Sequence, residues 1–172
     1  NSEANRGIVV DGVLRENTQI NLNGIVSPFS NLQLPYNLRA IQQKTNDGRT
    51  GLALYGRVSS RINQFTVTLE NQWQRASGLL DQLGGAFLVS TSFGDSLIRG
   101  AVDYRILPQL EINRLRLTRN WKLNQTSGLI LGLGYLNQEN DIANLLFGYN
   151  KKFKKIRMNI EANVDSQGQI YA

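Results

Sequence analysis

The stretch SGLILGLGYL, residues 127–136, alternates between two kinds of side chain. In an extended chain, successive side chains point to opposite faces of a sheet. One face of this stretch carries Leu129, Leu131, Leu133 and Tyr135. The other face is mainly glycine, so we expect a wall with little side-chain bulk there. The pattern predicts a β-strand whose apolar face either packs in a protein core or contacts lipid.

The same alternation recurs from about Thr50 onward, in stretches of about ten residues. Polar turns containing Gly or Asn separate these stretches, and almost no amphipathic helix pattern is present. We therefore predict roughly eight consecutive antiparallel strands joined as hairpins. The turns are SRIN, GD, PQ, KLNQT, NQEND and KKFK. Arg119 is an exception, because it falls on the apolar side of its strand.

The first fifty residues are less regular than the rest. We expect residues 1–50 to form irregular N-terminal strands, or a segment that packs against a barrel, and residues 51–172 to form the hairpin array. Pro35 lies within the alternating run LQLPYNLRAIQQ, which favours an edge or bulged position for that residue.

The composition excludes several kinds of chemistry. The chain of 172 residues fits one domain and contains neither cysteine nor histidine. Disulfides, imidazole metal sites and Ser-His-Asp or Cys-His catalysis are therefore excluded. We predict no enzymatic activity, no catalytic residue, no cofactor and no metal site. The net charge of +6 is compatible with an anionic partner.

No stretch approaches the roughly 18 apolar residues that a membrane helix needs. The amino terminus has no signal-peptide pattern and does not begin with methionine. We expect a mature or excised piece, in which a cleaved export signal would not be visible.

Two features favour lipid over a protein core as the environment of the apolar faces. Strands of about ten residues suit a tilted bilayer crossing, whereas soluble strands average about five or six. Aromatic residues also lie on the apolar face near the ends of six strands, as two interfacial girdles require. These candidate girdle residues are Trp73, Phe93, Tyr104, Trp121, Tyr135 and Tyr149.

The opposite faces carry charges of both signs. The candidate lumen-facing residues are Arg57, Glu70, Arg99, Asp103, Arg105, Arg114, Arg116, Arg157 and Glu161. The carboxylates among them could converge with arginines on a lumen site, but an ion-pair lattice filling a narrow barrel is the favoured interpretation.

The cluster KKFKK provides candidate ligands for anionic headgroups at Lys151, Lys152, Lys154 and Lys155. A solvated turn whose lysines discourage edge aggregation is the favoured alternative. Lipid phosphate ranks ahead of nucleic acid, because no stripe of interleaved aromatic and basic residues extends the patch.

These patterns together predict an all-β protein, an antiparallel up-and-down β-barrel of the transmembrane type with roughly 8–12 strands. We expect a pore or translocation channel, or part of one. A soluble β-barrel that binds a small apolar ligand and a fimbrial or surface adhesion module of sandwich type are the alternatives.

The ladder LILGLGYLNQENDIANLLFGYNKKFKKIRMNIEANVDSQGQIYA resembles the hairpin arrays of bacterial outer-membrane β-barrels. It is more distantly similar to the barrels of the ushers that export fimbrial subunits. The resemblance covers residues 50–172 and is one of pattern. It implies a location in the bacterial outer membrane, with the lipid bilayer and lipopolysaccharide phosphates as partners. It leaves any translocated substrate undefined.

Overall fold

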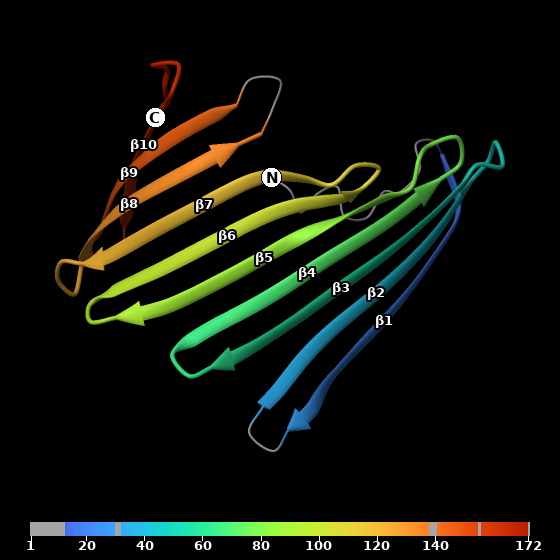
Figure 1. The fold of residues 1–172 in the computed structure, drawn as a ribbon, viewed down its shortest axis with the longest axis horizontal. Helices are drawn as coiled ribbons and strands as arrows, with labels where there is room; N and C mark the ends of the chain where they lie inside the picture. The colour runs from blue at the N-terminus through green and yellow to red at the C-terminus, as the bar shows by residue number, and fades with distance from the viewer. Residues whose placement is uncertain (1–12, 30–31, 138–140, 155, 172) are drawn as a thin grey trace. The chain divides into compact units, whose positions relative to one another are not determined.

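The computed structural model describes residues 13–29, 32–137, 141–154 and 156–171 (Figure 1). These residues form β-strands connected by turns. In order, the strands are β1 (Leu14–Phe29), β2 (Leu32–Thr45), β3 (Thr50–Ile62), β4 (Phe65–Ala76), β5 (Gln82–Phe93), β6 (Ser96–Leu107), β7 (Glu111–Lys122), β8 (Ser127–Leu136), β9 (Ile142–Lys152), β10 (Arg157–Asp165) and β11 (Ile170–Tyr171).

All eleven strands belong to one sheet and follow one another in chain order, which is an up-and-down topology (Figure 1). The eight strands predicted from Thr50 onward are confirmed as β3 to β10. In the part of the chain that the structure describes, the order ends at β1 on one side and at β11 on the other. The all-β antiparallel prediction is thus confirmed, and no pairing between β1 and β11 closes the described strands into a barrel.

The tight turns between strands have the residues that their backbone needs. Asn63 begins the two-residue connection from β3 to β4 and has a φ of 55°. Gly94 does the same between β5 and β6 with a φ of 56°. Positive φ at the first turn position suits hairpins because it matches the twist of the strands, and Asn and Gly adopt it most readily.

The N-terminal segment continues the sheet, with β1 and β2 as its two longest strands. Pro35 pairs with Ile25 of β1. On the other side of β2, the register with β3 begins one residue later, where Tyr36 pairs with Val58. Pro35 therefore lies just outside the β2–β3 ladder, where the missing N–H of proline costs no ladder hydrogen bond.

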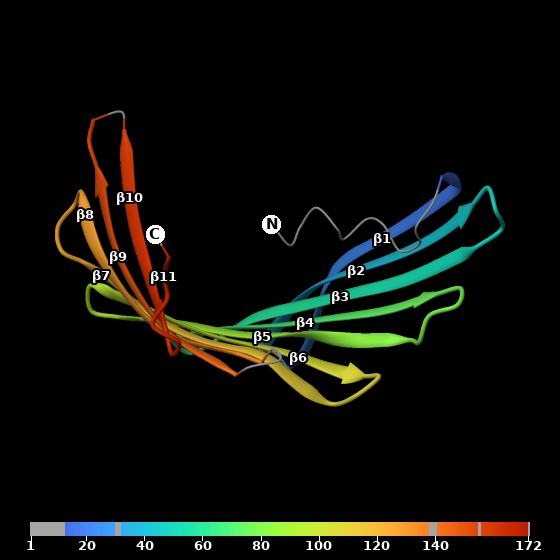
Figure 2. The same ribbon diagram turned by 90° about the horizontal axis from the view of Figure 1, so that it is seen from above.

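The chain divides into two compact units. Unit 1 contains residues 1–60, 68–86 and 104–111, and unit 2 contains residues 61–67, 87–103 and 112–172. In unit 2, the strands from β8 to β11 lie in chain order in both views (Figures 1 and 2).

The turn between β2 and β3 is organised by Asp47. The Thr45 hydroxyl donates a hydrogen bond to its carboxylate, and the Arg49 Nε donates another at 2.7 Å. The Thr45 hydrogen bond, with smaller contributions from Arg49, lowers the pKa of Asp47 below the ordinary aspartate value. A lowered pKa means that the folded turn favours the ionised carboxylate.

We expect Thr45→Val to raise the pKa of Asp47 toward the ordinary value, because it removes the hydroxyl donor and keeps the side-chain shape. In the wild type, the contribution of Asp47 to stability is present above its unfolded-state pKa and is lost as the pH falls through its lower folded-state pKa. A carboxyl ¹³C NMR titration of both proteins measures the change. An identical Asp47 pKa in the two proteins would contradict this prediction.

Candidate functional site

In unit 2, the strand register places the predicted apolar residues on one face of the sheet. Trp121 pairs with Leu129, which pairs with Tyr149 of β9, which pairs with Ile160 of β10. A second row lies parallel to this one, two residues away along each strand. It contains Arg119, Leu131, Phe147 and Ala162. Four strands thus present a shared surface, called here the apolar face of unit 2.

The apolar face of unit 2 is exposed, not buried. Leu133 is 57 % exposed, Phe147 49 % and Ile160 56 %. By contrast, Leu146 of β9 is 6 % exposed and points to the opposite face, because it lies between Leu145 and Phe147. The usual arrangement of a water-soluble sheet, apolar side chains inside and polar ones outside, is reversed here.

Unit 1 has the same reversed arrangement. Ile20 of β1, Ala40 of β2 and Leu54 of β3 form one register row, in which Ile20 is 65 % and Leu54 47 % exposed. Ile41 and Ala53 pair with each other on the other face and are 1 % and 0 % exposed. The side chains that avoid solvent therefore lie among the polar residues.

Two tyrosines on the apolar side of unit 1 cover glycines of neighbouring strands. A Cβ at Gly24 would lie 2.6 Å from the Tyr36 hydroxyl oxygen. At Gly85, a Cβ would lie 2.9 Å from the Tyr104 hydroxyl oxygen and 1.9 Å from the Glu70 carbonyl oxygen. Aromatic rings laid over strand glycines fill the missing side-chain volume and fix the register.

The Tyr104 hydroxyl, which lies over Gly85, is fixed by a hydrogen bond. It donates a hydrogen bond of 2.6 Å to Asn71 Oδ1, from β6 across β5 to β4. Tyr104 therefore joins three strands near the end of its own strand.

Five of the nine candidate lumen-facing residues form ion pairs between neighbouring strands. In unit 1, Arg57 contacts Glu70 at 3.4 Å, beside a 2.9 Å hydrogen bond between the Ser59 and Thr68 hydroxyls. In unit 2, Arg114 Nε donates to Asp103 Oδ2 at 2.7 Å.

The remaining lumen candidates lie on strands β6, β7 and β10. Arg105 pairs with Glu111. Glu161 accepts a 3.0 Å hydrogen bond from Asn159 Nδ2. The side chains of Arg99, Arg116 and Arg157 are exposed. The orientation of these residues toward a lumen stays a prediction.

The glycine-rich face of β8 is filled by its neighbours. A Cβ at Gly132 would lie 3.2 Å from Leu146, and one at Gly134 would lie 1.9 Å from Asn144 Oδ1. The expectation of a wall with little side-chain bulk is therefore wrong at these positions, because side chains from β9 and Thr118 of β7 occupy the space.

The candidate girdle aromatics all lie within the last four residues of their strands: Trp73 of β4, Phe93 of β5, Tyr104 of β6, Trp121 of β7, Tyr135 of β8 and Tyr149 of β9. In unit 2, Trp121 and Tyr149 flank Leu129 in one row. Tyr135 pairs with Leu115 at the far end of β8. These two rows are six residues apart, about 20 Å along the strand.

Arg119, the charged residue on the apolar side of its strand, contacts an aromatic ring and a hydroxyl group. Its guanidinium carbon lies 4.7 Å from the Trp121 ring centroid, and its Nε donates to the Ser96 hydroxyl at 3.2 Å. The sequence signal for this arrangement is an arginine two residues before a tryptophan on the same strand face.

The lysine cluster lies at the hairpin between β9 and β10. Lys151 Nζ is 5.9 Å from the Phe153 ring centroid. Lys151 also pairs with Met158, one row beyond Tyr149 and Ile160. Lys152 and Lys154 are exposed, and Lys155 lies outside the described residues.

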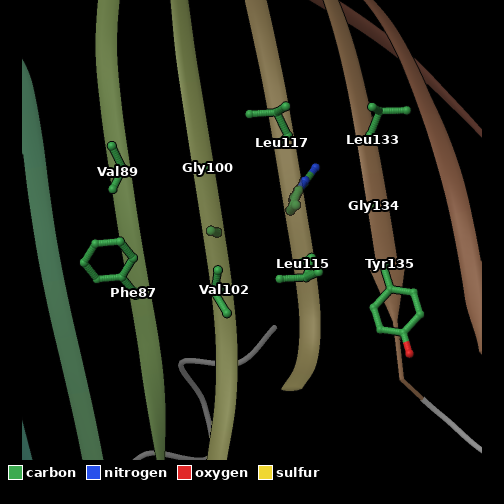
Figure 3. A pocket seen from close by; sticks show the side chains of 11 residues that line it. Phe87, Val89, Gly100, Val102, Leu115, Leu117, Leu133, Gly134 and Tyr135 are labelled. Atoms are coloured by element: carbon green, nitrogen blue, oxygen red, sulfur yellow. The ribbon is translucent and has the colours of Figure 1, made fainter. Parts of the chain in front are cut away.

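A hollow of about 400 Å³ lies in unit 2 and is lined almost wholly by apolar atoms. Figure 3 shows Phe87 and Val89 on one strand, Val102 on the next, Leu115 and Leu117 on a third, and Leu133 and Tyr135 on a fourth. Gly100, Ala101, Arg116 and Gly134 complete the lining. A Cβ at Gly100 would meet no heavy atom within 4 Å. The missing side chain of Gly100 contributes to the hollow.

No protein-family model, characterised protein or solved structure matches the chain. Among the described residues, no helix is long and apolar enough to cross a membrane. Within those same residues, no group of three or more Asp or Glu side chains could hold a metal ion.

Proposed function

We propose that this chain forms the wall, or part of the wall, of a β-barrel in a bacterial outer membrane. In this proposal the apolar faces contact lipid, the ion-paired faces line the interior, and the barrel serves as a pore or translocation channel. The observation that carries the proposal is the reversed burial, with Leu133 57 % exposed and Ile41 1 % exposed.

The exposed apolar side chains would be unfavourable in water. Burying one Leu, Ile or Phe side chain away from water is worth roughly 1.5–3 kcal/mol. A surface carrying Leu117, Leu133, Leu145 and Phe147, each between 45 % and 57 % exposed, loses that stabilisation in water. Lipid tails restore it without any further protein layer, and backbone groups stay paired in the strand ladder.

The aromatic rows support the same orientation. Their separation of about 20 Å along the strand is close to the apolar band of about 25 Å typical of outer-membrane barrels. Lys151 lies one row beyond Tyr149, and Arg119 lies one row inside Trp121 with its guanidinium against the Trp121 ring. Both side chains are long enough for their charges to reach headgroups and water. On the apolar face of β7 to β10, Arg119 is the one charged side chain between the row of Trp121 and Tyr149 and the row of Tyr135.

Membrane fractionation of the full chain tests the proposal. We expect the protein to remain in the membrane after washes with alkaline carbonate and urea, and its electrophoretic mobility to change on boiling. Purified in detergent, it should give discrete conductance steps in a planar lipid bilayer.

Two results would overturn the proposal. Monodisperse protein that unfolds cooperatively without detergent would favour the soluble β-barrel that binds an apolar ligand. Inserted protein that leaves the bilayer fully insulating would exclude the channel and indicate a structural barrel.

A further inference from the structure

We infer that unit 2 holds one anionic lipid on its apolar face, with the lipid phosphate at Arg119 and an acyl chain in the hollow beside Gly100. This inference rests on the membrane location proposed above. It assigns a specific site to a surface that would otherwise contact lipids without preference.

The cationic end of the site is Arg119. It lies on the apolar face because it pairs with Leu131 in the β7–β8 register. Trp121 lies against its guanidinium at 4.7 Å, and the Ser96 hydroxyl accepts from Nε at 3.2 Å. In the part of the chain that the structure describes, no carboxylate contacts Arg119, so its terminal nitrogens can donate to a phosphate.

The apolar end of the site is the hollow. Leu117, which lines it, is two residues from Arg119 on the same face of β7, about 7 Å along the strand. Gly100 and Tyr135, on other strands, also line the hollow (Figure 3). A phosphate at Arg119 and a chain lying across Leu117 therefore match the order of groups in a phospholipid. A water-soluble phosphate compound would leave the apolar hollow unused.

Quenching of Trp121 fluorescence by brominated lipids tests the site. The chain contains two tryptophans, so Trp73→Phe leaves Trp121 as the single reporter. The full chain in this background is reconstituted with brominated phosphatidylglycerol or brominated phosphatidylcholine, and the relative binding of the two lipids is compared. We expect phosphatidylglycerol to bind more tightly.

Two substitutions separate the ends of the site. Arg119→Gln should reduce the preference for phosphatidylglycerol about fivefold, the effect of one basic side chain at an anionic surface. Gly100→Leu should weaken quenching by both lipids and leave their ratio unchanged, because it fills the hollow and leaves Arg119 in place. Arg99→Gln, on the opposite face of β6 and outside the lining of the hollow, is the matched control and should change neither quantity.

The outcomes separate the site from the membrane proposal. If no brominated lipid quenches Trp121, the membrane location itself is wrong. If both lipids quench but Arg119→Gln behaves like Arg99→Gln, the phosphate site is wrong and the membrane location stands. Inorganic phosphate can also be added as a competitor of the brominated lipid. If it competes equally well in Gly100→Leu and in the Trp73→Phe protein, the site binds phosphate without a lipid chain. That result would also overturn the inference.

Discussion

Leu133→Arg should lower the free energy of unfolding in lipid vesicles by about 2–4 kcal/mol, the cost of a cationic side chain near the middle of the apolar band of a membrane strand. Leu133 pairs with Leu117 on one side and Leu145 on the other, and it lies between the two aromatic rows. Urea unfolding in vesicles of short-chain phosphatidylcholine, followed by tryptophan fluorescence, measures the change.

Leu129→Arg is the matched control on the same strand and face. Leu129 lies in the row of Trp121 and Tyr149, where an arginine can reach the headgroups. Its cost should fall to about 0–1 kcal/mol. A depth-dependent cost is expected for lipid and not for a protein core.

The two alternatives predict different pairs of results. If the apolar face met water, both substitutions would be neutral or would raise solubility, since Leu133 is already 57 % exposed. If the face packed in a protein core, both would be destabilising to a similar degree. Either pair would contradict the proposed orientation.

The local part of the fold could be predicted from the sequence because side-chain direction in a strand depends only on parity. The faces of Leu129 and Leu133, and the turns at Asn63 and Gly94, follow from neighbouring residues alone. The same is true of the girdle aromatics, whose place near the strand ends follows from the turn positions.

Contacts between strands could not be predicted in this way. The ion pair of Arg114 with Asp103 and the hydrogen bond of Tyr104 with Asn71 depend on the strand register. Alternation does not determine the register, because a shift of two residues keeps every side chain on the same face. The hollow beside Gly100 likewise depends on which side chains the neighbouring strands place around it. The β8 glycines were misjudged for this reason, since Leu146 and Asn144 come from β9.

Arg119 illustrates a different limit. A single charge on an apolar strand face is an anomaly in the pattern, and composition gives no reason for it. Its explanation lies in the Trp121 ring and in the Ser96 hydroxyl at the start of another strand. Exceptions to an alternating pattern are therefore good places to look for ligand-binding residues, because a structural purpose must offset their unfavourable position.

Gly85→Ala should be strongly destabilising, by about 1–3 kcal/mol. The new Cβ would lie 1.9 Å from the Glu70 carbonyl oxygen and 2.9 Å from the Tyr104 hydroxyl oxygen. The tyrosine side chain could rotate away, but the Glu70 oxygen belongs to the backbone of β4. The substitution therefore requires the β4 and β5 backbones to separate.

Gly100→Ala is the matched control, a strand glycine whose Cβ would meet no heavy atom within 4 Å. It should be neutral or stabilise by up to about 1 kcal/mol through the reduced entropy of the unfolded chain. Urea unfolding in the same vesicles compares the two variants, and Tyr104→Phe in the Gly85→Ala background separates the hydroxyl contact from the backbone contact. Removing the hydroxyl should recover little stability, because the nearest obstacle is the Glu70 backbone. Equal stability of the Gly85 and Gly100 variants would mean that β4 and β5 do not approach as closely as this register requires.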